Sequence, residues 1–167
     1  MAKWDNLLLF KKNSAEDYLK TAQNVAAWLK KYEVKKTVGK SWEIRSGAGS
    51  DEGDDLASKM TDRSIYSGAA GIGFFYIQLY EATGDKQYLD EAAEAAEYLL
   101  GTFQKELGVK PGIHGGITGE GFFAETLYQK TGEQKYRDYA IQVGDVAYET
   151  AVKEDGKIHW DNLVDYM

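Results

Sequence analysis

Two histidines are the residues of this chain best suited to acid–base or metal chemistry, because it contains no cysteine. His114 stands just before the pair Gly115-Gly116 at the expected start of a helix, where an imidazole can transfer a proton or recognise a cation. A packed or capping histidine is the competing interpretation, so the catalytic residue stays unknown and His114 is the candidate. His159 is expected at the surface beside Trp160. Two histidines without a third ligand do not build a zinc site, so no metal-binding residue is predicted.

Aromatic side chains form a second group of candidates. Trp42, Tyr66 and Trp160, together with His114, are the predicted substrate-binding residues. Rings with a polar handle suit a surface that recognises a peptide or a sugar. The alternative interpretation is that both tryptophans fill gaps between layers of helices.

Acidic residues give no clear site. Glu120 and Glu125 fall on a helix expected to be buried, which is unusual for carboxylates, so either is a candidate for facing an internal cavity. Five residues separate them by about 500° around a helix, so they do not share a face as an acid–base pair. The acidic run at 51–55 lacks the glycine and glutamate of a calcium loop, whose places fall on Leu56 and Asp62, so a solvated charge run is favoured over calcium.

An internal repeat of forty-eight residues must position these candidates. Across the twenty-eight positions that start at Ile65 and Ile113, thirteen are identical. The shared residues include three glycines at the head of a helix, a Phe-Phe pair, and a Thr-Gly pair before an acidic residue. Glycine in a helix costs about 1 kcal/mol relative to alanine, so three of them point to a close backbone approach or a ligand at the helix N-terminus.

Each copy of the repeat predicts a helical hairpin, at about residues 65–104 and 113–152. The first helices, at 66–82 and 114–130, are apolar on every side and are expected to be buried all round. The second helices, at 86–104 and 134–152, are amphipathic and should cover the first from outside. Hairpins that stack in this way curve into a ring. The predicted fold is therefore all-α, a partial α/α toroid with an incomplete ring, in a single domain spanning 1–167.

The flanks of the repeat are less regular. An amphipathic helix is expected at 14–32, followed by a Gly-, Ser- and Lys-rich stretch at 33–63 with a short extended piece near 41–45. Asp155-Gly156 predicts a turn, and the residues from Lys157 to Trp160 echo those around Trp42. No third glycine-headed helix follows, so we expect this chain to be the N-terminal part of a longer repeat protein.

Composition excludes several classes of protein. Twenty basic and twenty-seven acidic side chains give a net charge of −7, which argues against a nucleic-acid partner. No run of apolar residues is long enough to span a membrane, and no secretory signal is visible, so a cytoplasmic location is expected.

The motif from Tyr66 to Ile72, with Thr83-Gly84-Asp85 after it, resembles the hairpin repeat of lanthionine synthetase C-like proteins, and His114 to Gly119 with Thr131-Gly132-Glu133 looks like the next repeat. The resemblance implies a toroid of seven hairpins and, in the enzymes, zinc that activates peptide cysteines for thioether formation. The family holds zinc with two cysteines and one histidine. None of these ligands carries over, because this chain has no cysteine; zinc is expected only in the full-length family, and activity of this chain stays open.

Three functions compete at this stage. The first is a lanthionine synthetase C-like protein that is incomplete and inactive by itself. The second is a carbohydrate-active α/α toroid, a glycoside hydrolase or an epimerase. The third is a non-catalytic scaffold that binds a peptide. Open edges of an unfinished ring would in addition favour self-association.

Overall fold

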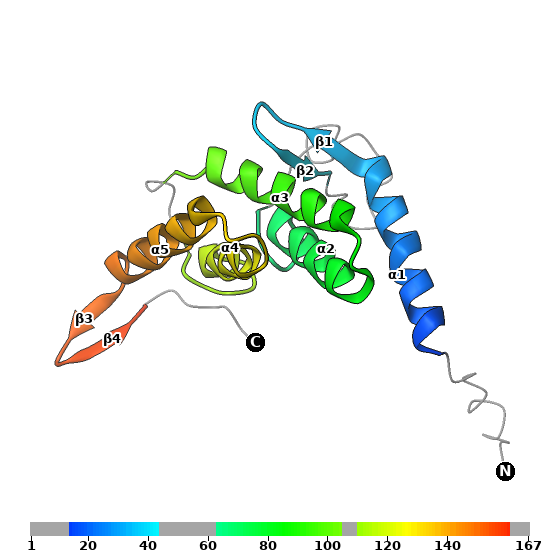
Figure 1. Ribbon diagram of the computed structural model, residues 1–167. Coiled ribbons are helices and arrows are strands. Elements are labelled where there is room, and N and C mark those ends of the chain that lie inside the picture. Colours follow the sequence, from blue (N-terminus) through cyan, green and yellow to red (C-terminus); the bar gives the residue numbers. More distant parts are fainter. Residues whose placement is uncertain (1–13, 44–62, 105–109, 161–167) are drawn as a thin grey trace, which may run out of the picture.

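The computed structural model describes residues 14–43, 63–104 and 110–160, and these residues form an all-α fold with two small β-hairpins (Figure 1). The helices are α1 (Ala15–Leu29), α2 (Ala69–Thr83), α3 (Lys86–Gly101), α4 (Ile117–Thr131) and α5 (Gln134–Glu149), with a 3-10 turn at Lys30–Tyr32. The strands are β1 (Glu33–Lys35), β2 (Lys40–Trp42), β3 (Val152–Glu154) and β4 (Lys157–His159). No helix in the described ranges is long and apolar enough to cross a membrane.

The two predicted helical hairpins are present, α2 with α3 and α4 with α5, and they close with the same turn. Gly84 and Gly132 take left-handed φ values of 70° and 72°, and each donates its N–H to a tyrosine carbonyl at 2.7 Å. Left-handed backbone is the conformation that glycine adopts without strain. The acidic residue that follows each glycine donates its backbone N–H to the hydroxyl oxygen of the threonine that precedes the glycine. The repeat in the sequence is therefore a repeat in the structure.

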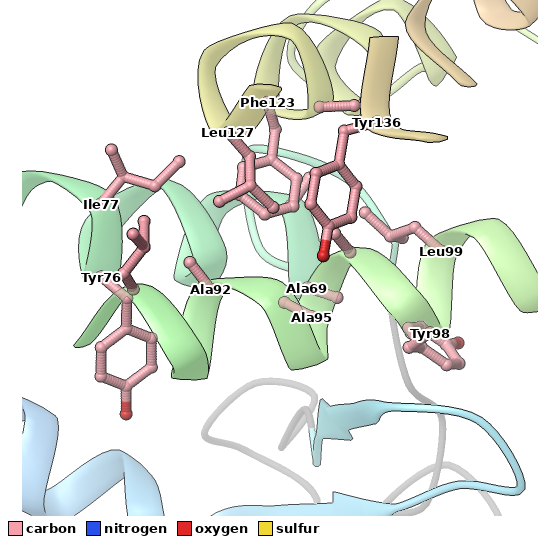
Figure 2. Close-up of a cluster of buried hydrophobic side chains, with 14 of the residues drawn as sticks. Ala69, Tyr76, Ile77, Ala92, Ala95, Tyr98, Leu99, Phe123, Leu127 and Tyr136 are labelled. Atoms are coloured by element: carbon pink, nitrogen blue, oxygen red, sulfur yellow. The ribbon is translucent and has the colours of Figure 1, made fainter. Parts of the chain in front are cut away.

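The hairpins pack side by side in two layers, with α2 beside α4. Gly73 of α2 leaves room for the ring of Phe123 from α4, since a Cβ there would lie 2.4 Å from that ring and 3.1 Å from Ala95. Figure 2 shows Phe123 and Leu127 meeting the small residues of α3 in one fully buried cluster. The two hairpins are thus neighbouring units of a helical repeat, which confirms the predicted all-α fold class.

The helix that was expected at 14–32 is confirmed, with Ser14 and Asp17 forming a reciprocal capping box at its start. The extended piece expected near 41–45 is the strand β2, which pairs antiparallel with β1. The acidic run at 51–55 lies outside the described residues.

Three expectations about the helices were wrong in detail. The inner helices begin three residues late, at Ala69 and Ile117, because the residues before Gly68 and Gly116 form turns. The outer helix expected to reach Val152 ends at Glu149, since Asp155 and Gly156 both take positive φ and close a two-residue β-hairpin. The inner helices are also not buried all round.

The glycines at the heads of α2 and α4 should be irreplaceable. A Cβ at Gly71 would lie 2.1 Å from the carbonyl oxygen of Ile65, a backbone atom that cannot turn aside. Gly71→Ala is therefore expected to lower the free energy of unfolding by about 1–3 kcal/mol in urea titrations. Gly144→Ala is the matched control on α5, because nothing lies within 4 Å of its Cβ position. This control should raise stability by about 0.5–1 kcal/mol, and equal effects at both positions would contradict the account.

Candidate functional site

The loops that precede the two inner helices lie against each other. The backbone N–H of Tyr66 donates to the carbonyl oxygen of His114 at 3.0 Å. These residues stand at equivalent positions of the two repeats, and both side chains are exposed, Tyr66 by 81%. The structure therefore brings two of the four predicted substrate-binding residues to one place, the glycine-headed end of the hairpins.

The helix N-termini at this end are occupied by the chain itself. The N–H groups of Ala70 and Gly71 donate to the carbonyls of Arg63 and Ser64, and Ile117 donates to Lys110. Backbone amides that are paired in this way are not available to an anion. Of the two roles expected for the glycines, the structure thus supports close backbone approach, since a Cβ at Gly71, Gly116 or Gly119 would lie within 2.4 Å of a backbone oxygen.

Apolar side chains are also exposed or partly exposed in these loops and on the inner helices that follow them. We call Tyr66, Phe74, Ile113 and Phe122 the aromatic face. Phe122 and Ile113 are about half exposed, and the rings of Phe74 and Phe122 lie 5.6 Å apart. Phe74 and Phe122 are equivalent residues of the repeat, so the two inner helices present matching rings on this side.

The two tryptophans predicted for the same surface lie elsewhere. Trp42 is only 3% exposed and packs at 6.2 Å from the ring of Tyr76, between the β1–β2 hairpin and the helices. Trp160 is half buried, and its indole N–H donates to the carbonyl of Ala147 at 2.9 Å, near the end of α5. Trp42 therefore fills the core, and the aromatic face does not include it.

A buried ion pair that sequence reasoning missed lies directly beneath the glycine-headed end. Arg63 donates to both carboxylate oxygens of Glu120, at 3.1 Å from Nε and 2.6 Å from Nη2. The same guanidinium donates to the carbonyl of Leu99 at 2.9 Å, and the hydroxyl of Tyr139 donates to Glu120 at 2.5 Å. Glu120 is 3% exposed. Its presence on a buried helix was the one signal in the sequence, and it faces Arg63, not an internal cavity.

The Glu120 carboxylate stabilises the charged form of Arg63 and the neutral form of Tyr139. Burial by itself would lower the pKa of Arg63, but the hydrogen bonds and the attraction of Glu120 outweigh burial and raise it. Burial raises the pKa of Tyr139 far above its usual range, and the negative charge of Glu120 adds to this effect. Tyr139 therefore stays a neutral donor, and the pair is a structural element that holds the loop before α2 against α4.

The described residues do not fit a zinc centre of the cysteine–cysteine–histidine kind. The whole chain has no cysteine, and within the ranges the structure covers no group of three histidine, aspartate or glutamate side chains is placed to hold a metal. His114 and His159 belong to different parts of the fold, one before α4 and one at the end of β4.

The family model described as lanthionine synthetase C-like protein matches residues 59–165, which include both helical hairpins. No curated protein matches the chain.

Removing the buried carboxylate should destabilise the fold. Glu120→Ala leaves the Arg63 guanidinium without its partner, and breaking a buried pair typically costs about 3–5 kcal/mol. We expect a loss near the lower end, about 3 kcal/mol, because the Arg63 side chain is 26% exposed. Glu125→Ala, on the same helix and more exposed, is the control and should change stability by less than about 1 kcal/mol in urea unfolding. Similar losses of stability for both variants would contradict a stabilising role of the Arg63–Glu120 pair.

Stability should fall in alkaline solution through buried tyrosines. Burial, and then the charge of Glu97, raise the pKa of Tyr136 from 10.0 to about 12. A raised tyrosine pKa means that the folded state retains the proton, so stability is full below pH 10 and is lost as pH rises toward about 12. Tyr136→Phe should make the loss between pH 7 and about pH 11 smaller, measured by urea unfolding at both values. Tyr18→Phe, at an exposed position, should leave that loss unchanged. An unaltered loss in Tyr136→Phe would contradict the assignment.

Proposed function

Because the chain belongs to the lanthionine synthetase C-like family, we propose that it binds a peptide at its glycine-headed end and does not by itself catalyse thioether formation. The observation that supports the proposal is the hydrogen bond between the two repeat loops, which brings the exposed residues Tyr66 and His114 together. Enzymes of this family modify peptides, so a peptide is the ligand class that the resemblance favours.

The aromatic face has the character of a peptide-binding surface. Exposed rings supply large apolar contact area, and the phenol of Tyr66 adds a polar group at the rim. The first turns of α2 and α4 are held by backbone hydrogen bonds and by the Arg63–Glu120 pair beneath them. Binding at such a surface loses little free energy to ordering of the protein.

We assign no catalytic role to this chain, because it lacks the cysteines that bind zinc in the family enzymes. A zinc-bound thiolate site of the family type needs two cysteines, and this sequence contains none. When zinc is bound in the family enzymes it activates a peptide thiol. The residues of this chain would contribute only binding and orientation of the peptide, with His114 next to the bound segment.

A carbohydrate-active toroid is not favoured by any observation. That alternative needs tryptophan platforms and inward carboxylates. Trp42 is in the core, and Glu120 is held by Arg63 and Tyr139. The proposal therefore combines the family assignment with the role of a non-catalytic peptide-binding scaffold.

Peptide binding can be measured with a fluorescein-labelled linear peptide that carries a cysteine and a dehydroalanine between apolar residues. We expect saturable binding by fluorescence anisotropy, and a Tyr66→Ala/Phe122→Ala variant should bind about tenfold more weakly, because both exposed rings are lost. Tyr18→Ala is the control, since Tyr18 is also an exposed tyrosine but lies on α1. Absence of binding by the unmodified chain, or equal loss in the control, would overturn the proposal.

A further inference from the structure

Helix α1 carries an apolar stripe that no described element covers. Tyr18, Val25 and Trp28 are exposed by 64%, 41% and 53%. Tyr32, in the 3-10 turn that directly follows α1, continues the stripe, with its ring 4.7 Å from that of Trp28. Helix α1 contacts the rest of the protein through a different set of side chains, of which only Ala26 is fully buried. Figure 1 shows α1 at one end of the row of helices, with α5 at the other.

The spacing of this stripe is that of a helix–helix seam. Tyr18, Val25 and Tyr32 are seven residues apart, and Thr21 and Trp28 fill the alternate positions. Positions repeated every seven residues in two interleaved sets are the a and d positions of a coiled-coil heptad. The charged residues Glu16, Lys20 and Lys30 fall outside the seam, and Lys30 pairs instead with Glu91 of α3 at 3.5 Å.

We propose that the α1 stripe binds the α1 stripe of a second copy of this chain, in antiparallel orientation about a two-fold axis. The charged residues next to the stripe favour a second copy as the partner and an antiparallel orientation of the two helices. Asp17 and Lys31 border the seam on the same side, two heptads apart. In an antiparallel pair of copies, Asp17 of one lies opposite Lys31 of the other, twice over, and Asn24 lies opposite Asn24.

The parallel arrangement lacks this complementarity. In a parallel pair, the g positions of one helix lie opposite the e positions of its partner. With Tyr18 at an a position, Asp17 is at g and the e positions are Ala22 and Leu29, which carry no charge. Antiparallel pairing also places the positive end of each helix beside the negative end of its partner. Because α1 is already folded against α2, association does not have to supply the free energy of forming the helix.

The dimer can be tested on the full chain by sedimentation velocity over a range of concentrations. We expect a reversible shift from monomer to dimer, and Val25→Glu should weaken it at least about tenfold, since two carboxylates would be buried in the seam. Ile141→Glu is the matched control, because Ile141 is also an exposed aliphatic residue but lies on α5, and it should leave the dimer unchanged. Lys31→Glu should weaken the dimer by repulsion from Asp17, whereas Lys20→Glu should not. A monomer at all concentrations, a larger assembly, or a dimer that survives Val25→Glu would overturn the proposal.

Orientation is tested by cross-linking, which is simple because the chain has no cysteine of its own. Asn24→Cys should be joined to itself by a short bis-maleimide, and Gln23→Cys, which points away from the seam, should not. Equal cross-linking of both variants, or cross-linking only of Gln23→Cys, would overturn the antiparallel register. Peptide binding at the aromatic face involves none of these residues, so each proposal can fail without the other.

Discussion

The contact between Arg63 and Glu120 is the interaction on which the arrangement of this protein depends. It joins the loop before α2 to the first turn of α4, and through Leu99 and Tyr139 it reaches both outer helices. A charge inside a protein is tolerated only when its partner and its hydrogen bonds are in place. Together with the ion pairs Lys130–Glu81 and Lys135–Glu97, the Arg63–Glu120 contact adds directional contacts to the apolar packing between the two hairpins.

Polar contacts are made at equivalent positions of the two outer helices. Tyr139 of α5 occupies the position that Glu91 occupies in α3, forty-eight residues earlier. Glu91 accepts from Lys40 of β2 at 2.6 Å, as Tyr139 contacts Arg63 and Glu120. Both residues thus connect an outer helix to a segment that precedes it in the chain. The first contact is an ion pair and the second is a set of hydrogen bonds made by a tyrosine. Both hairpins nevertheless use the same position of the outer helix to contact the preceding part of the chain.

Sequence patterns predicted what is local and missed what is not. The Thr-Gly turns and the helix faces follow from glycine at positive φ and from helical periodicity, so both hairpins were predicted within a few residues. Arg63 and Glu120 are fifty-seven residues apart and follow no period, so only the odd placement of a carboxylate on a buried helix hinted at the pair. The burial of Trp42 likewise depends on how β1 and β2 fold onto α3, which no local pattern encodes.

The use of the glycines limits what the glycine-headed end can do. Because loop carbonyls already accept the N–H groups of Ala70, Gly71 and Ile117, these three amides are not available to a ligand. Exposed side chains are the other groups that this end presents. The two positions that meet there, Tyr66 and His114, differ between the repeats, while the three glycines that follow at Gly68, Gly71 and Gly73 recur in the second copy. The repeat thus keeps the same backbone contacts at this end of both inner helices, while the exposed side chains at the two meeting positions differ.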